Sequence, residues 1–148
     1  MSVAQPRIRT NVICPKGDEM LLVRHRKGEK TYWLLPGGGV DFGESFSVCA
    51  ERELLEETGL IVEVERPIWI SEAIDPEGSR HIVNVYLLAR IVGGEIKQGL
   101  DDVIAEVAFK PIADLLNLTL YPPVAQQLRD LHASDYKTPF TYLGEMWA

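Results

Sequence analysis

Apolar and polar residues alternate along several short segments of the chain, and such alternation is typical of β-strands that bury one face. Turn-forming residues separate these segments, as from Pro15 to Asp18 and at Gly93 and Gly94. The pattern predicts strands at residues 8–14, 20–26, 32–35, 61–70, 81–91, 95–98 and 104–109. Pro67 falls inside the fourth of these, so we expect an edge position or a bulge there.

Three other segments predict helices. The first follows a glycine-rich loop at residues 37–39; it begins near Ser45, whose hydroxyl suits the free N–H groups of a helix start, and it ends at Gly59. Two shorter helices follow prolines, at residues 112–116 and 124–132. Strands around a central helix, with two helices at the end, predict an α/β fold in which a mixed sheet lies between helical layers.

The composition indicates a globular chain whose charge limits its partners. The chain has 148 residues, 46% hydrophobic and 25% charged, which predicts one domain over residues 1–148 with a sizeable core. The net charge of −7 argues against broad binding to nucleic acid or to an anionic membrane surface, since both need a basic face. A small phosphorylated ligand stays compatible, because bound metal ions would reverse the sign of the charge locally.

The cysteines and the two ends of the chain add three expectations. Cys14 and Cys49 lie among apolar residues and are expected to be buried free thiols. The first residues lack the apolar stretch of a secretory signal, and no apolar run reaches the length of a membrane span, which predicts a cytoplasmic protein. The segment 135–148 is rich in apolar residues, so we expect it to pack on the domain or on a second subunit, as in a homodimer.

The central helix places carboxylates where apolar side chains are expected. At about 100° per residue, Phe46, Cys49 and Ala50 share one arc of this helix. The next positions on the same arc hold three glutamates, Glu53, Glu56 and Glu57. Carboxylates at this spacing repel one another unless a cation neutralises them, and clusters of oxygen ligands suit hard divalent ions such as Mg²⁺ or Mn²⁺.

Two observations bear on whether these glutamates form a site. Arg52 can pair with Glu56 one turn later, but a single arginine does not balance three glutamates. Val48 and Leu55 lie on the opposite arc, so we expect the helix to be covered on both sides. The alternative is a solvated helix end with a run of charge, which is what most glutamate-rich helix segments are.

The glycine-rich segment and the helix together contain a longer pattern, over residues 38–60. Gly38 is followed after five residues by Glu44, and after seven more by the sequence RELLEETGL. This arrangement resembles the signature box of the Nudix hydrolases, G-x5-E-x7-R-E-U-x-E-E-x-G-U, in which U is an aliphatic residue. All nine specified positions match, and the probability of a chance match in a chain of this size is on the order of one in ten million.

The resemblance implies a fold, a reaction and a cofactor. The fold is an α/β/α sandwich with a mixed central β-sheet, built as one Nudix domain. The reaction is metal-dependent hydrolysis of the pyrophosphate bond of a nucleoside diphosphate linked to a second group X, which yields a nucleoside monophosphate and phospho-X. Mg²⁺ or Mn²⁺ would neutralise the phosphates and lower the pKa of a bound water.

The resemblance also implies roles for residues of the box. Glu53, Glu57 and Arg52 are the expected catalytic residues. Glu56 and Glu57 are expected to bind the metal, and Glu53 to act as a metal ligand or as the general base. Arg52 is expected to orient a carboxylate of this group, and Glu44 to be structural or an outer contact of the metal.

Residues outside the helix are expected to contact the substrate. By resemblance, the backbone at Gly37 and Gly38 shapes the substrate site, and a carbonyl there, at Gly38, is a further metal ligand. Arg24 and Arg26 end the second predicted strand and are candidates for binding the substrate's phosphates, arginine by a bidentate contact. The alternative for both arginines is a solvated strand end.

The general base has candidates downstream of the box as well. In some Nudix proteins the base comes from a later loop, and the acidic residues of this region are Asp101, Asp102 and Glu106. For each of them, an ordinary acidic loop residue is the alternative reading.

The group X is the least determined part of the prediction. Pro76 lies 16 residues after Leu60, where ADP-ribose hydrolases of the family commonly have a proline, and this favours ADP-ribose, although a proline suits any turn. One alternative is a house-cleaning hydrolase of (oxidised) nucleoside triphosphates. Another is a ligand sensor that keeps the fold without the chemistry, for which we would expect a degraded box or an appended DNA-binding domain.

Overall fold

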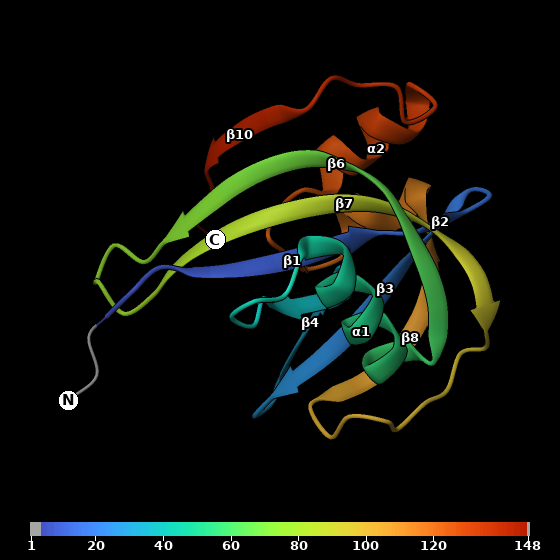
Figure 1. The fold of residues 1–148 in the computed structure, drawn as a ribbon, viewed down its shortest axis with the longest axis horizontal. Helices are drawn as coiled ribbons and strands as arrows, with labels where there is room; N and C mark the ends of the chain where they lie inside the picture. The colour runs from blue at the N-terminus through green and yellow to red at the C-terminus, as the bar shows by residue number, and fades with distance from the viewer. Residues whose placement is uncertain (1–3, 148) are drawn as a thin grey trace.

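The computed structural model describes residues 4–147 (Figure 1). In chain order its elements are β1 (Arg7–Ile13), β2 (Pro15–Lys16), β3 (Glu19–Lys27), β4 (Lys30–Leu34), β5 (Gly37–Gly39), α1 (Phe46–Thr58), β6 (Leu60–Ile74), β7 (His81–Gly94), β8 (Ile104–Pro111), the 3-10 helix η1 (Ile112–Asn117), β9 (Leu120–Tyr121), α2 (Ala125–Ala133) and β10 (Thr141–Glu145). Each predicted helix, and each predicted strand except that at residues 95–98, overlaps one of these elements. Residues 1–3 of the expected domain and residue 148 of the apolar tail lie outside the described residues.

The strands form two mixed sheets that meet at the end of β1. The first has the order β10-β6-β7-β1-β5, in which β1 runs parallel to β7 and antiparallel to β5. The second has the order β2-β3-β4-β9, and β8 also pairs with β3. Backbone hydrogen bonds join the two, from the N–H of Leu21 to the carbonyl of Cys14 (3.2 Å) and from the N–H of Val12 to the carbonyl of Pro36 (2.8 Å). The expected α/β class with mixed sheets is confirmed.

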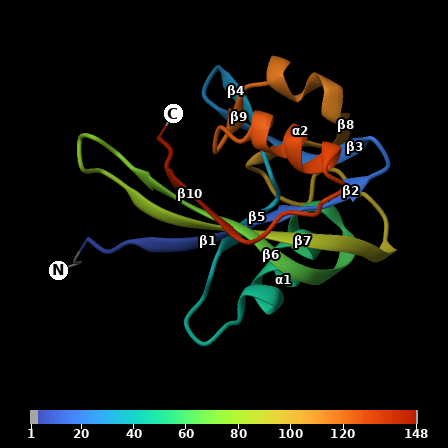
Figure 2. The ribbon, with the colours of Figure 1, turned by 90° about the horizontal axis from the view of Figure 1, so that it is seen from above.

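Neighbouring residues of the strands bury their side chains on opposite sides of these sheets, because successive side chains of a strand alternate. Val12 belongs to an apolar cluster with Leu54 of α1. Its neighbour Ile13 belongs to a second cluster with Leu115 of η1 and Leu128 of α2. Figure 2 shows α1 and α2 on opposite sides of β1, β6 and β7, so the strands lie between helical layers.

The outer face of α1 is not covered, contrary to expectation. Val48 and Leu55, on that face, are 54% and 51% exposed. The helix contacts β1, β5, β6 and β8, and its buried side chains include Cys49, Ala50 and Leu54. The expectation of cover on both sides was wrong because α1 is itself an outer layer, with the strands on one side of it alone.

The strand expected at residues 95–98 is an irregular segment instead. The side-chain amide of Gln98 bonds to both backbone groups of Val107: it donates to the carbonyl (2.8 Å) and accepts from the N–H (2.9 Å). The N–H of Lys97 donates to the carbonyl of Thr58 at the end of α1 (2.9 Å). These contacts attach the segment to β8 and α1 without a ladder of backbone hydrogen bonds, so the predicted strand was wrong.

The apolar C-terminal tail packs on its own chain. Its strand β10 runs parallel to β6, with Thr141 opposite Trp69. Arg66 of β6 donates to the carbonyls of Thr138 (3.1 Å) and Tyr136, which ties the start of the tail to the same strand. The tail therefore completes one edge of the first sheet.

Smaller expectations have clear outcomes. Cys14 and Cys49 are buried free thiols, as predicted. The pairing of β6 with β7 shifts register between Pro67 and Trp69, which confirms the predicted bulge. In the part of the chain that the structure describes, every helix is too short or too polar to cross a membrane.

The two faces of α1 predict opposite responses to truncation at neighbouring positions. Leu54 is fully buried, so Leu54→Ala leaves a cavity and should lower the free energy of unfolding by about 2–5 kcal/mol. Leu55→Ala, at the half-exposed position that follows, is the matched control and should change it by less than about 1 kcal/mol. Urea unfolding followed by circular dichroism measures both, and equal losses would contradict this assignment of the buried face.

Candidate functional site

Strand β5 brings a glycine backbone against α1. Its residues, expected to form a loop, instead pair antiparallel with β1, with Gly38 opposite Thr10, so that expectation was wrong. A Cβ at Gly37, where φ is 148°, would overlap the carbonyl of Thr10. A Cβ at Gly38 would lie 2.6 Å from Oε1 of Glu53. Glycine at position 38 therefore lets β5 and α1 approach closely enough for Glu53 to reach the strand, and glycine at position 37 lets β5 pair closely with β1.

Local signals set where α1 begins and ends. The hydroxyl of Ser45 accepts a hydrogen bond from the N–H of Val48 (3.1 Å), which caps the start of the helix as the sequence predicted. Gly59 adopts a left-handed conformation, with φ of 82°, and its N–H donates to the carbonyl of Leu55 (3.1 Å). These caps fix the register in which the glutamates of the helix face β5.

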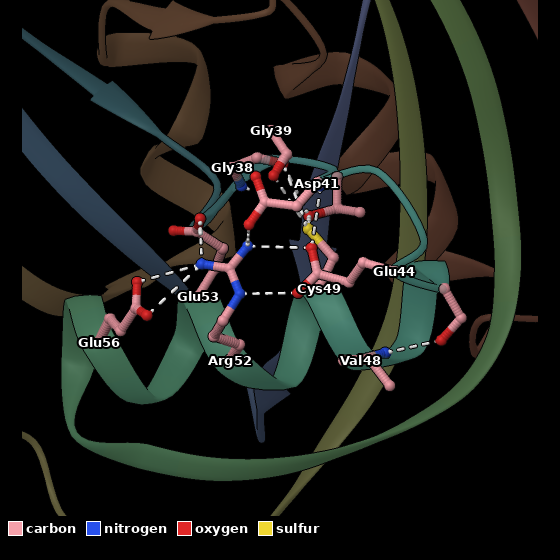
Figure 3. A network of polar contacts seen from close by, with 11 residues as sticks. Gly38, Gly39, Asp41, Glu44, Val48, Cys49, Arg52, Glu53 and Glu56 are labelled. Atoms are coloured by element: carbon pink, nitrogen blue, oxygen red, sulfur yellow. Dashed lines mark hydrogen bonds and ion pairs between the residues drawn. The ribbon is translucent and has the colours of Figure 1, made fainter.

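Arg52 is the centre of a network of carboxylates (Figure 3). Its Nε and Nη2 donate to the two carboxylate oxygens of Glu44, at 2.7 and 3.0 Å, in a bidentate pair. Its Nη1 donates to Oε1 of Glu53 (3.0 Å) and lies 3.3 Å from Oε2 of Glu56. Asp41 approaches Nη2 at 3.5 Å. One guanidinium thus connects the loop before α1 to the carboxylates along the helix.

Burial and neighbouring charges shift the pKa values of these carboxyl groups in different directions. The hydrogen bonds from Arg52 lower the pKa of Glu44 to about 2. Burial, with a smaller effect of the nearby charge of Glu53, raises the pKa of Glu57 to about 8, against the opposing effects of Arg9 and of the hydrogen bond from Gly37. Burial also raises the pKa of Glu53, although Arg52 opposes this shift. Glu44 is therefore a fixed negative charge, whereas Glu53 and Glu57 are carboxylates short of positive charge.

The predicted metal ligands lie in different surroundings. Glu57 is 6% exposed and accepts a hydrogen bond from the N–H of Gly37 (2.9 Å), and the carboxylate of Glu53 faces Gly38. The side chain of Glu56 is 57% exposed and pairs with Arg52. Within residues 4–147, no three His, Cys, Asp or Glu side chains are arranged as a formed metal site. The donor set still fits Mg²⁺ or Mn²⁺, because carboxylate oxygens are their preferred ligands and a cation would offset the burial of Glu57.

The carbonyl of Gly38, the other predicted ligand, already has hydrogen-bonding partners. It accepts from the hydroxyl of Thr10 (3.2 Å) and from the thiol of Cys49 (3.6 Å). The same thiol lies 3.5 Å from the carbonyl of Gly39. Cys49 and Thr10 therefore help hold β5 on the helix, and a metal contact of Gly38 stays a prediction.

Two predicted site residues pair with each other. Glu106 of β8 lies opposite Arg24 of β3, and its Oε1 accepts from Nε of Arg24 at 3.2 Å. The guanidinium of Arg24 also lies 5.9 Å from the ring centre of Trp33. Arg26, two residues further along β3, is exposed. This pairing offsets the charge of Glu106 and makes it less suited to act as the base, whereas Arg24 uses only its Nε here and keeps its other donors for a phosphate.

Of the downstream acids, Asp101 is the one whose charge acts on a glutamate of the helix. Its charge raises the pKa of Glu57 and opposes the lowering of the pKa of His25 that burial causes. Its side chain accepts from the N–H of Val103 (2.9 Å), which orders the turn before β8. Asp102 follows it in the same turn and is exposed. Asp101 is therefore the acid of this loop whose charge acts on the site.

Sequence reasoning missed Arg9 of β1. Its Nη2 donates to the carbonyl of Leu35 (3.1 Å) and its Nε to Oδ1 of Asn11 (3.3 Å). Its charge lowers the pKa of both Glu57 and Glu53, so it supplies part of the positive charge that they lack. The signal was available in the alternation of β1, because Arg9 shares a strand face with the buried Ile13.

The buried carboxyl group of Glu57 predicts a pH dependence of stability without metal. Its pKa rises from 4.5 to about 8 on folding, so between these values the folded protein holds a proton that the unfolded chain has lost. The free energy of unfolding should therefore be highest below pH 4.5. It should fall by about 2–5 kcal/mol as the pH rises from there through 8.

Unfolding in EDTA at successive pH values measures this slope. Glu57→Gln cannot titrate and should remove most of it. Glu63→Gln is the matched control, because it makes the same change in an exposed ion pair with Arg90, and should keep the slope. A slope unchanged by Glu57→Gln would contradict the assignment to Glu57.

The sequence of this chain is similar to those of known proteins. A family model described as NUDIX domain matches residues 5–131. A protein named ADP-ribose pyrophosphatase, from Methanocaldococcus jannaschii, is 31% identical over 102 residues, which are 68% of this chain and 60% of that protein. A protein named RNA pyrophosphohydrolase, from Caulobacter vibrioides, is 34% identical over 110 residues, which are 66% of this chain and 63% of that protein.

A solved structure agrees over a longer range. The crystal structure of an ADP-ribose pyrophosphatase from Streptococcus suis has a TM-score of 0.72 and 28% identity, and covers 93% of this chain and 99% of its own. The alignments to the two relatives above span less than two thirds of the length of either. Since the family match extends over most of the chain and includes the complete box of residues 38–60, this chain belongs to the NUDIX domain family, as its box predicted.

Proposed function

We propose that this protein is a pyrophosphohydrolase that cleaves the pyrophosphate bond of a nucleoside diphosphate linked to a second group X. The products are a nucleoside monophosphate and phospho-X, and ADP-ribose is the first substrate to test. The observation that supports this most is the position of Glu53 and Glu57 beside the glycine backbone of β5, with Arg52 bonded to Glu53. Two carboxylates short of positive charge, at the edge of a polar site, suit a cation and a phosphorylated substrate.

The residues of this chain divide the work of hydrolysis. Glu53, Glu56 and Glu57 would hold Mg²⁺ or Mn²⁺, which would neutralise charge on the phosphates and lower the pKa of a bound water. The N–H of Gly37 fixes the orientation of the Glu57 carboxylate. Arg52 does the same for Glu53 through a hydrogen bond of 3.0 Å. Both carboxylates therefore keep their positions while the substrate enters and leaves.

Glu53 is also suited to accept the proton of the attacking water. Burial raises its pKa above that of an ordinary carboxyl group, and a higher pKa makes the carboxylate a stronger base. Asp101 is the alternative base, since its charge already acts on Glu57. Glu106 fits this role less well, because it is paired with Arg24.

The identity of X rests on weaker grounds. Two of the proteins to which this chain is similar are named ADP-ribose pyrophosphatase. Pro76, whose spacing from the box favours the same substrate, lies in the turn between β6 and β7. A cavity of about 610 Å³ includes residues on both sides of that proline, Ile74 and Gly78, and it also includes Gly39 of β5. A substrate that occupied this cavity would contact the ends of this turn.

Several expectations accompany this proposal. The substrate is a small nucleotide, with neither nucleic acid nor a membrane surface as partner, in keeping with the net charge of −7. A cytoplasmic location and a homodimer stay predictions. The exposed apolar side chains of the tail, such as Phe140 and Tyr142, would suit a second subunit.

A panel of nucleotides with Mg²⁺ and with Mn²⁺ tests the reaction and the substrate together. The panel contains ADP-ribose, nucleotide sugars, diadenosine polyphosphates, and ordinary and oxidised nucleoside triphosphates, with products identified by mass. We expect a preference for ADP-ribose, giving AMP and ribose 5-phosphate. A preference for triphosphates, giving a monophosphate and pyrophosphate, would favour the house-cleaning alternative. Tight binding of one compound without turnover would favour a sensor.

Removal of one carboxylate tests the proposed metal ligands. Glu57→Gln keeps the size of the side chain but removes its charge, so metal-dependent turnover should fall by about 100-fold or more. Glu63→Gln makes the same change at an exposed ion pair and should leave turnover unchanged. Circular dichroism confirms that both variants fold, and full activity of Glu57→Gln would refute its role.

The downstream acids can be separated by single substitutions. Asp101→Asn should lower turnover or metal affinity, because its charge acts on Glu57. Asp102→Asn and Glu106→Gln are expected to have smaller effects, the first because Asp102 is exposed and the second because Glu106 is paired with Arg24. Rates measured over a range of Mg²⁺ concentrations distinguish a loss of turnover from a loss of metal affinity. If Glu106→Gln had the largest effect, the ion pair with Arg24 would have to open during catalysis.

A further inference from the structure

A basic cavity adjoins the site on the far side of β5. It has a volume of about 610 Å³ and lies where β1, β6 and β7 extend beyond the helices (Figure 1). Its charged lining comes from three arginines: Arg7 and Arg9 of β1, and Arg80 at the end of the β6–β7 turn. Gly39 of β5 and His81 of β7 also line the cavity.

The lining of this cavity is positively charged, although the chain as a whole is negatively charged. The protein has a net charge of −7, yet the described lining contains no Asp or Glu side chain. No carboxylate of residues 4–147 forms an ion pair with Arg7 or Arg80. The nearby acid Asp75 accepts hydrogen bonds from the N–H groups of Glu77 and Ser79, so the turn already engages its carboxylate.

The arginines are also close enough to repel one another. Arg80 lowers the pKa of Arg9, in the same direction as burial does. The guanidinium of Arg7 lies over β5, where a Cβ at Gly39 would be 3.4 Å from its Nη2. Like charges gathered in this way destabilise a fold unless a bound anion offsets them.

A buried polar atom in the same lining lacks a partner. Nε2 of His81 is enclosed, and within the described residues nothing donates to it or accepts from it. Most buried polar atoms are hydrogen-bonded, so an unpaired one beside a cavity suggests a group that binds there. Since Nε2 is enclosed, an oxygen of a phosphate would accept from it only after the ring of His81 turned toward the cavity, with the proton on Nε2.

Arg9 relates the cavity to the carboxylates of α1. It lies opposite Gly39 in the pairing of β1 with β5, and its charge acts on both Glu57 and Glu53. Arg9 therefore lines the cavity and acts on the two glutamates at the same time.

We propose that this cavity binds a phosphate group of the substrate other than the two phosphates of the scissile bond. The proposal rests on the proposed function, and it adds that a substrate of this class with an additional phosphate ester, on one of the groups that the pyrophosphate joins, is preferred to the same substrate without it. Three guanidinium groups favour phosphate over a carboxylate, because phosphate offers more acceptor oxygens and can take bidentate contacts from more than one arginine.

Binding of inorganic phosphate without metal tests the cavity apart from catalysis. Titration calorimetry in EDTA compares phosphate with malonate, a dicarboxylate, on the wild-type protein and its variants. We expect phosphate to bind more tightly than malonate, and Arg80→Gln or Arg7→Gln to weaken phosphate binding by about tenfold or more. Arg90→Gln is the matched control, because Arg90 is exposed and pairs with Glu63 outside the cavity, and it should change binding by less than about twofold.

Three results of this titration would overturn the proposal: no phosphate binding by the wild type, equal binding of malonate, or an equal loss in Arg90→Gln. The last would mean that net charge alone governs binding. Because no metal and no turnover are involved, failure of the proposed hydrolysis leaves this experiment interpretable.

Matched substrates test whether the bound phosphate belongs to the substrate. NADPH and NADH differ by one phosphate on the ribose of the adenosine, and ADP-ribose can be compared with its derivative phosphorylated on the terminal ribose. We expect kcat/KM to be about tenfold or more higher for the phosphorylated member of one pair, and this ratio to fall toward one in Arg80→Gln. Ratios near one for both pairs in the wild type would overturn the assignment to substrate.

Discussion

The close approach of β5 to α1 is the constraint on which the rest of the site depends. The N–H of Gly37 holds the carboxylate of Glu57, and the missing side chain of Gly38 leaves room for Glu53. A larger residue at Gly38 would displace the carboxylate of Glu53, and one at Gly37 would push β5 from β1 and move the N–H that holds Glu57. Arg52 secures Glu53 from the other direction. A rigid backbone and a guanidinium thus hold the acidic groups at positions that their mutual repulsion opposes.

The fold could be predicted where burial follows a local pattern. The apolar, β-branched run of β7 and the caps of α1 at Ser45 and Gly59 can be read from neighbouring residues of the sequence, and both elements appear where expected. The failures depend on distant partners. The strand at residues 37–39 exists because β1 pairs with it, and the segment at 95–98 is held by a side-chain contact from Gln98 to Val107. The exposure of Leu55 depends on how many layers cover the helix, which its own periodicity does not specify.

In the candidate site, too, residues could be predicted where they share one element and not where distant strands bring them together. The residues from Arg52 to Glu57 share one helix, so their spacing alone brought them together in the prediction. Arg9 comes from a strand more than forty residues earlier, and only the pairing of β1 with β5 places it beside them. The pairing of β3 with β8 likewise matches Arg24 with Glu106, which sequence reasoning had assigned to separate roles. Contacts across strands are tertiary information, and periodicity within one element does not contain them.

The first sheet has a consequence for how the chain reaches its folded state. Its central pair joins strands from distant parts of the sequence, with Asn11 and Asn84 separated by 73 residues, and its last strand, β10, pairs with β6. Closing loops of this length costs conformational entropy before any pairing compensates, so such sheets assemble slowly compared with helical bundles. During synthesis, the outer edge of β6 stays open until residues 141–145 leave the ribosome. Until then the newly made chain presents an unpaired sheet edge at β6, and such an edge is the part of a fold most open to association with other chains.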